Sequence, residues 1–265
     1  MKTSVLFSLF LALLIAVPAD ANTPVHSSNE PHTDIFFGPM MVLPRGMMRD
    51  DVKTMGVWEL GFARQIKQTP LHLGFSMGLG SYGSYQTEVP YFDNGQWLNT
   101  RFKVNDNVRT FFTSLRYDFR QNATLVPYAQ VKFGNYRMSS RYRIEDPMSD
   151  PDCPKDFENE LMHADNTWIY GGSLGLRFQP LANATESRDR FTIDVYGGFM
   201  RGNIIHYAAH NAPHGGAMVN GPIQVGDDLF IHREANYIAN QYHGTNVYRS
   251  PLDTIEFGLR LGVRF

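Results

Sequence analysis

Charged side chains recur between the apolar residues of several segments of this chain. If these segments are β-strands, the charges share one face, because successive side chains of a strand point to opposite faces. The set holds four acids and five bases: Glu59, Asp118, Asp194, Glu256, Arg116, Lys132, Arg177, Arg260 and Arg264. Charges removed from water must be paired, and this set is nearly balanced. These charged residues could line a path for protons or ions. We expect instead that they form a packed polar interior.

A group of histidines near the end of the chain is a second candidate for chemistry: His206, His210, His214, His232 and His243. On a helix, the spacing of four between the first three would turn ring nitrogens toward one metal ion. Pro213, Gly215 and Gly216 interrupt any such helix, and no nearby carboxylate completes the group. We therefore expect solvated loop histidines and no metal, with a pH-responsive loop as the alternative.

Two further candidates lie in polar segments that we predict to be loops. Ser139, Ser140, Glu145, Asp146 and His206 could form a Ser–His–acid site that acts on lipids, but no spacing fixes them together. We expect no enzymatic activity. The aromatic and arginine residues of segment 137–144 could bind lipopolysaccharide phosphates or a partner through bidentate arginine contacts. A plain loop is the preferred interpretation.

The last segment, Thr254 to Phe265, gives the clearest structural pattern. Its apolar residues fall on one face of a strand: Ile255, Phe257, Leu259, Leu261, Val263 and Phe265. Glu256, Arg260 and Arg264 alternate with glycines on the other face. The length suits a tilted strand that crosses a bilayer. The pattern predicts a barrel-closing, membrane-spanning C-terminal strand.

Seven earlier strands are predicted, near residues 34–43, 58–66, 71–80, 111–119, 126–134, 168–178 and 191–199. The first is the weakest, and Pro39 within it would be tolerated only at an edge or a bulge. Connections alternate in length, with long irregular segments expected at about 86–107, 139–166 and 202–253. Short periplasmic turns and long extracellular loops are typical of outer-membrane barrels.

Composition and the N-terminus indicate export. Net charge is −2 and the pI about 6.5, so no basic field favours nucleic acid. Lys2, an apolar run from Val5 to Val17 and a small-residue site predict a signal peptide over 1–21, cut after Ala21. A retained membrane anchor is the alternative. A tail (22–33) and a barrel domain (34–265) follow, and the single Cys153 excludes an internal disulfide.

Alternation alone suits both a lipocalin-like barrel, apolar inside, and a membrane barrel, apolar outside. The polar face is rich in glycine, which fits a narrow, filled lumen and not a water-exposed surface. Aromatic residues gather near the strand ends, with Phe119, Phe178, Phe191 and Phe265 at one end and Trp168 and Tyr170 at the other. These features favour the membrane barrel.

The runs Pro127–Gly134 and Tyr170–Phe178, with the Phe-ended last strand, resemble small outer-membrane β-barrel proteins of the OmpA/OmpX-like type, particularly those of Bacteroidetes-type bacteria. The resemblance implies an eight-stranded antiparallel up-and-down transmembrane β-barrel without a cofactor, in the outer membrane of a Gram-negative cell envelope. It implies a structural or surface-interaction role, with a narrow porin-like channel and a lipid-modifying enzyme as alternatives. Expected partners are outer-membrane lipid, lipopolysaccharide, the barrel-assembly machinery through the last strand, and an extracellular ligand at the loops.

Overall fold

A computed structural model describes residues 31–67, 69–93, 96–120, 123–145, 156–179, 190–209, 217–218 and 246–265. Its long strands are β1 (Thr33–Pro44), β2 (Met55–Gln65), β3 (Leu71–Asp93), β4 (Gln96–Asp118), β5 (Leu125–Glu145), β6 (Asp156–Phe178), β7 (Arg190–Ala209) and β9 (Asn246–Arg264). A one-turn helix α2 (Met48–Asp51) and a short strand β8 (Ala217–Met218) complete the elements. The predicted signal peptide and Cys153 lie outside these residues.

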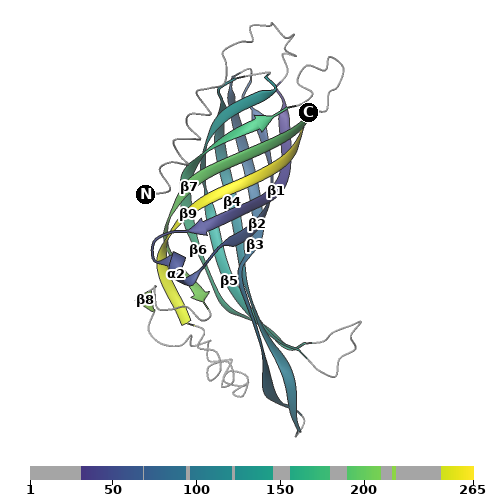
Figure 1. The fold of residues 1–265 in the computed structure, drawn as a ribbon, viewed down its shortest axis with the longest axis vertical. Coiled ribbons are helices and arrows are strands. Elements are labelled where there is room, and N and C mark those ends of the chain that lie inside the picture. The colour runs from purple at the N-terminus through teal and green to yellow at the C-terminus, as the bar shows by residue number, and fades with distance from the viewer. Residues whose placement is uncertain are drawn as a thin grey trace.

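The eight long strands close into a barrel. Each pairs antiparallel with its neighbours along the chain, and β1 pairs with both β2 and β9. Thr33 and Phe265 exchange backbone hydrogen bonds, so the strands of both chain ends meet at the rim that carries the short turns (Figure 1). The predicted eight-stranded, up-and-down architecture is confirmed. β8 pairs only with the outer part of β9.

The apolar face of the barrel points outward. In β9, Leu259 and Leu261 are 41% and 47% exposed. Arg260, which lies between them, and Glu256, on the same face as Arg260, are buried. Trp58, Val131 and Trp168 show the same outward exposure on other strands. A continuous apolar band of this size is unfavourable in water and is what lipid requires of a barrel wall. The barrel spans a membrane. No helix in the described part of the chain is long and apolar enough to do so.

The prediction for Pro39 was wrong, because a closed barrel has no edge. Pro39 lies in the middle of β1 and pairs with Trp58 of β2. On its other side the β1–β9 ladder runs from Phe37↔Leu261 to Met40↔Gly258 in unchanged register, but Gly38 and Pro39 have no partner in it. A Cβ on Gly38 would lie 1.9 Å from the carbonyl oxygen of Leu259. Strands β1 and β9 therefore approach closely where the proline donates no hydrogen bond.

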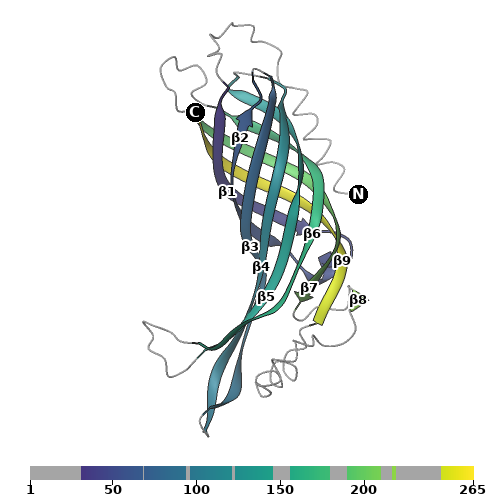
Figure 2. The same cartoon turned by 180° about the vertical axis from the view of Figure 1, so that it is seen from behind.

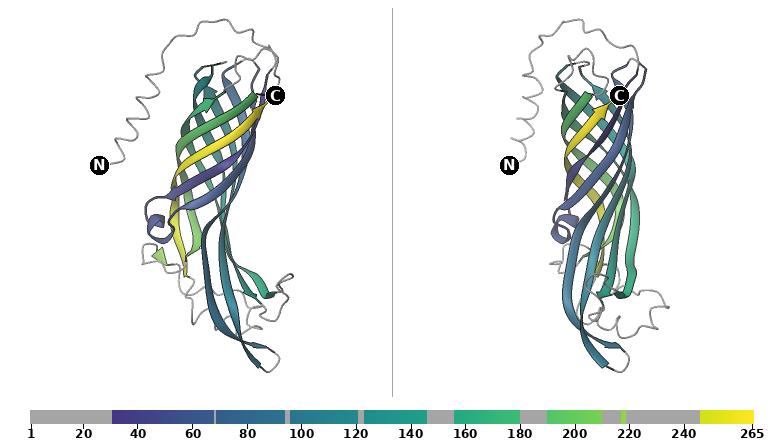
Figure 3. Two further views of the ribbon diagram at one scale, coloured as in Figure 1. Left: turned by 45° about the vertical axis from the view of Figure 1, so that its right-hand side comes forward. Right: turned by 90° about the vertical axis from the view of Figure 1, so that its right-hand side faces the viewer.

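The predicted long loops were wrong in extent. Strands β3 and β4 stay paired out to Asp93↔Gln96, through most of segment 86–107. Strands β5 and β6 stay paired out to Glu145↔Asp156, within segment 139–166, and β7 and β9 continue into segment 202–253. Beyond the membrane the alternation is reversed, because apolar residues such as Phe102 and Ile144 are buried on the inner face while Arg101 and Arg141 are exposed on the outer one. The hydrogen-bonded ladder continues through this region. Figures 2 and 3 show this extension projecting from the mouth opposite the C-terminus.

The β1–β2 connection, predicted to be a polar link, carries helix α2 and lies near that mouth (Figure 3). Helix α2 places Met48 at 0% exposure, and Val52 just after it is 2% exposed. Both join an apolar cluster with Met40, Met55 and other lumen residues. The hydroxyl of Tyr207 donates a 2.5 Å hydrogen bond to Asp51 of the same helix. The connection thus covers the outer end of the lumen.

The candidate site in the barrel lumen

One carboxylate, Asp34, joins three arginines at the periplasmic end of the lumen. Its oxygens accept hydrogen bonds from Arg116 (2.8 Å), Arg177 (2.6 Å) and Arg264 (2.7 Å). The side chain is 1% exposed. Four different strands supply these groups, because inward positions of β1, β4, β6 and β9 meet at the barrel axis. Asp34 is therefore the shared acceptor of the ion cluster at the periplasmic end of the lumen.

Two of the arginines around Asp34 also donate hydrogen bonds to other carboxylates. Arg177 makes a bidentate contact with Asp194, with distances of 2.7 and 2.9 Å. Arg116 donates to Asp118 at 2.8 Å, and His72 contacts the other oxygen of that carboxylate at 3.1 Å. Planar guanidinium groups suit such paired geometry better than lysine does. Each buried charge of this cluster thus has at least one oppositely charged partner.

A second cluster lies farther along the axis. Arg260 donates to both oxygens of Glu59, at 2.8 and 3.1 Å, and the Tyr196 hydroxyl donates to the same carboxylate at 2.9 Å. The guanidinium lies 4.0 Å from the centre of the Tyr196 ring. Lys132 donates to Glu256 at 2.9 Å. Cation–π contacts add to the ion pairing where water is excluded.

All nine charged residues predicted to face the lumen are buried there. The sequence reasoning missed Asp34, and it also missed the role of His72. The predicted set contained five bases and only four acids, and that shortfall of one carboxylate was the available signal. Asp34 escaped notice because Phe36, Met40 and Val42 also face inward, so β1 has apolar residues on both faces.

Aromatic rings cover glycines on the inner wall. Tyr128 lies directly opposite Gly175, where a Cβ would come within 2.3 Å of the tyrosine ring. Tyr196 has the same relation to Gly258, at 2.2 Å. Both tyrosines are fully or almost fully buried. The glycine-rich inner face thus makes room for large rings next to the ion pairs, as expected in a narrow barrel.

A cluster of buried apolar side chains lies in the outer part of the lumen, near the buried polar residues Asp106 and Ser140. Buried side chains from six strands and the α2 region gather there: Met40, Val42, Met48, Val52, Met55, Val57, Val108, Tyr136, Met138, Ile169, Met200 and Ile205. The hydroxyl of Tyr136 contacts the Met55 sulfur at 3.0 Å. A hydrophobic constriction of this kind opposes ion passage because an ion would lose its hydration shell.

The proposed Ser–His–acid grouping is not formed by the contacts at the rim. The hydroxyl of Ser140 donates to Asp106 at 2.5 Å and bonds the Tyr82 hydroxyl at 2.9 Å. His206 instead bonds Asp165, through Nδ1 at 2.8 Å and through its backbone N–H, also at 2.8 Å. Glu145 lies beside Arg101, and Asp146 falls outside the described residues. Segment 137–144 is strand and not loop.

The contacts of Asp165 bridge a seam between β6 and β7. The β6–β7 ladder of the described residues begins at Ile169↔Gly202, below this point. Burial raises the pKa of Asp165, but hydrogen bonds from the His206 backbone and ring outweigh it and lower the pKa overall. Burial lowers the pKa of His163, whose Nε2 lies 3.2 Å from the His206 carbonyl oxygen. His210, His214, His232 and His243 lie outside the described residues, within which no metal-binding group of three or more His, Cys, Asp or Glu occurs.

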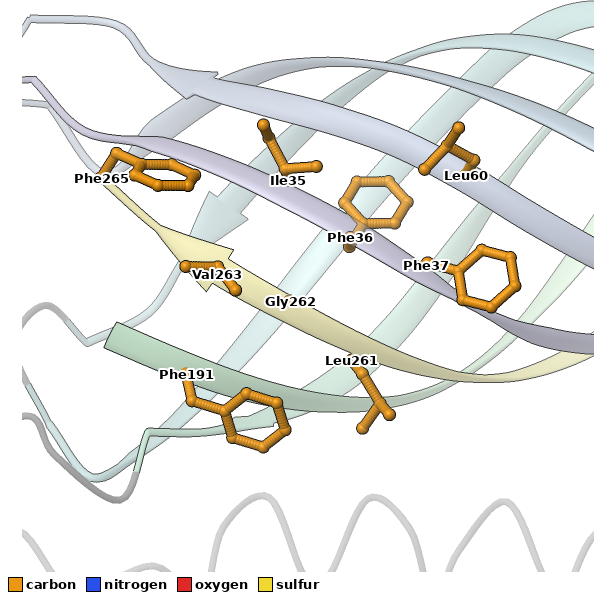
Figure 4. Close-up of a pocket in the computed structure, with 9 residues that line it drawn as sticks. All are labelled: Ile35, Phe36, Phe37, Leu60, Phe191, Leu261, Gly262, Val263 and Phe265. Carbon is orange, nitrogen blue, oxygen red and sulfur yellow. The ribbon is translucent and has the colours of Figure 1, made fainter. Parts of the chain in front are cut away.

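The outward residues of the last strand border a shallow groove near the periplasmic end. Figure 4 shows Leu261, Val263 and Phe265 of the C-terminal segment beside Ile35 and Phe37 of β1. Leu60, Phe191 and Phe36 complete the lining, with Gly262 at its floor. Phe257 and Leu259 continue the apolar face outside the groove. The groove therefore faces hydrocarbon and offers no polar group for catalysis.

Comparisons with known proteins give solved structures of similar architecture. Ail, the attachment invasion locus protein of Yersinia pestis, is 11% identical, with a TM-score of 0.40 over 89% of this chain and 99% of that one. The N-terminal barrel domain of Pseudomonas aeruginosa OprF is 12% identical (TM-score 0.32; 89% and 97% covered). The outer-membrane protease OmpT of Escherichia coli is 7% identical (TM-score 0.32; 92% and 99% covered). No protein-family model and no curated protein matches the chain.

Likeness at this level carries no statement about activity. The barrel's own geometry, with eight closed antiparallel strands, an apolar outside and a charged inside, is that of a small outer-membrane β-barrel. The chain has the OmpA/OmpX-like fold. Its membership in a Bacteroidetes-type group stays a prediction.

Proposed function

We propose that the protein is a non-conducting, non-enzymatic outer-membrane barrel that acts structurally in the envelope or presents a surface for interaction outside the cell. The supporting observation is a pair of buried side-chain clusters. Ion pairs centred on Asp34 and Glu59 lie in the periplasmic part of the lumen, and the apolar cluster that includes Met48 lies in its outer part. A polar path through the first part would end at the second.

The extension of β3–β6 supports the surface role. These strands are the longest in the barrel, at 21 to 23 residues, and they carry the chain well beyond the mouth (Figure 1). A barrel that only sealed the membrane would need strands of roughly 9–11 residues. Long ordered strands outside the bilayer hold a fixed surface in front of the cell, which is how barrels of this build make contacts.

Conductance across a planar bilayer tests the closed lumen. Purified mature protein should give no steady current steps, and a general porin in the same chamber should give them. Well-resolved, reproducible steps from the folded protein would reject the closed barrel and favour the narrow channel. Lipid profiles from cells with and without the protein test the enzyme alternative, and a difference in lipid A would support it.

Removal of the extension tests the surface role separately. Ser84 pairs with Asn105, so residues 85–104 can be replaced by a two-residue Asn-Gly turn at that rung. The shortened barrel should still migrate faster unheated than boiled on SDS gels, since the membrane part is unchanged. Cells carrying it should lose whatever surface binding the intact protein confers. Unchanged binding would exclude the extension as the interaction surface.

A further inference from the structure

Two arginines face each other on the outside of the barrel, just beyond the apolar band. Arg109 of β4 and Arg137 of β5 are direct cross-strand partners, and both are exposed. Neither has a carboxylate partner among the described residues. Two cations farther out on the same strands do: Arg101 lies 3.5 Å from Glu145, and Arg143 lies 3.6 Å from Asp156. Arg141, between them and the pair, donates to the Asn159 amide oxygen at 3.2 Å.

Like charges placed directly opposite each other on a sheet destabilise it. The same row continues to Asn166 of β6, the exposed partner of Arg137. Two guanidinium groups and an amide thus offer several N–H donors side by side, with one carbonyl as the only side-chain acceptor. An anion with several oxygens, placed between the two arginines, would remove their repulsion and accept from both.

The surface directly below this pair is aromatic. Phe111 lies two residues from Arg109 on the same face, and it is 50% exposed. Phe133 and Trp168 are 54% and 56% exposed and stack with ring centres 5.1 Å apart. Exposed aromatic rings mark the interface between hydrocarbon and water on membrane barrels. The arginine pair therefore stands at the depth of the lipid headgroups.

We propose that Arg109 and Arg137 bind a phosphate of outer-leaflet lipopolysaccharide while its acyl chains lie against Phe111, Phe133 and Trp168. The juxtaposition of unpaired cations with an apolar platform selects an amphipathic anion. A soluble polyanion would use the cations and leave the aromatic surface uncovered. The site lies on the outer wall, so it does not depend on whether the lumen conducts.

The test compares binding of defined probes to detergent-purified mature protein, by native mass spectrometry or thermophoresis. The probes are bisphosphorylated lipid A, the same lipid without phosphates, inorganic pyrophosphate and heparin. The double variant R109Q/R137Q should bind bisphosphorylated lipid A at least about tenfold more weakly than the wild type, since two charge-assisted contacts are lost. Removal of the lipid phosphates should weaken binding to the wild type by a similar factor.

Two matched variants control for general surface charge. Arg101→Gln removes an exposed cation from the same strand, higher on the extension, and Arg64→Gln removes one from β2 near the periplasmic rim. Both should bind the lipid as the wild type does. Heat-modifiable migration checks that every variant is folded.

Equal lipid binding by R109Q/R137Q and wild type would overturn the proposal. An equal loss in R101Q would do the same, because the effect would then be nonspecific. Binding of heparin or pyrophosphate that depends on Arg109 and Arg137, without binding of lipid A, would assign the pair to a soluble anion and reject the lipid.

Discussion

Positively charged side chains in the lumen have carboxylate partners, whereas two on the outer wall of β4–β5 have none among the described residues. Inside, each of Arg116, Arg177, Arg260, Arg264 and Lys132 has a carboxylate of this chain within 2.9 Å. Outside, Arg109 and Arg137 face each other without such a partner among the described residues. Burial explains the difference, because an unpaired charge costs several kcal/mol or more where water is excluded and little where water or lipid headgroups can solvate it. The folded chain must supply the partners inside, and the membrane can supply them outside.

The largest effect is expected from Asp34→Asn. The substitution leaves Arg116, Arg177 and Arg264 with a neutral acceptor in place of a carboxylate that is 1% exposed. Loss of one member of a buried ion network costs about 3–5 kcal/mol. Urea unfolding of the protein in lipid vesicles should show this loss as a lower midpoint.

Glu145→Gln is the matched change on the extension. Glu145 contacts Arg101 at 3.5 Å, and that arginine side chain is 61% exposed. Its loss should stay within about 0.5 kcal/mol, as for other exposed pairs. Similar unfolding midpoints for the two variants would break the contrast between lumen and outer wall.

An intermediate effect is expected from Gly175→Ala. The new Cβ would lie 2.3 Å from the buried Tyr128 ring, which must shift within the packed lumen. Such overpacking costs roughly 1–3 kcal/mol. Gly172→Ala on the same strand is the control, because its Cβ would meet nothing closer than 3.5 Å and should leave stability unchanged. Equal stability of both variants would show that the rings do not depend on the glycines.

The smallest effect is a local opening at the seam bridged by Asp165. Hydrogen bonds lower the pKa of this carboxyl below its ordinary 3.8, so its contribution is present above that pH and lost as pH falls through the folded value. The pKa of His163 is lowered from 6.5 by burial, so protonation below that pH also favours the open seam. Acidification should therefore loosen the seam twice, first when His163 gains a proton and again, at lower pH, when Asp165 does.

Hydrogen exchange at the His206 amide measures this opening, because that N–H donates to Asp165. Asp165→Asn should speed its exchange at neutral pH and leave the ladder at 169–178 protected. The wild-type amide should lose protection, relative to the intrinsic rate, as pH falls below about 6.5. Asn166→Ser, at the neighbouring exposed position, should change neither. Identical exchange in D165N and the wild type would show that Asp165 does not hold the seam.

The same physical contrast explains what could be predicted from the sequence. Where one face meets lipid and the other the lumen, alternation is strong, so the membrane parts of β2–β7 and β9 and all nine lumen charges were assigned to the correct face. It fails where that pattern changes. Strand β1 is apolar on both faces, which hid Asp34. In the extension the pattern is reversed, with Phe102 and Ile144 buried and Arg101 exposed, which hid the outer halves of β3–β6. Met48 and Val52 sit in a polar link, so nothing local marked them as the cover of the lumen.

The apolar face of the barrel is expected to meet hydrocarbon, and only the extension is expected to meet water. Nitroxide labels on β5 test this expectation most directly, in vesicles, after the single Cys153 is replaced by serine. A label at Val131, 59% exposed on the barrel wall, should collide more with oxygen than with a water-soluble nickel chelate. A label at Arg141, exposed on the extension, should show the reverse. Nickel collisions at Val131 as frequent as at Arg141 would contradict the account.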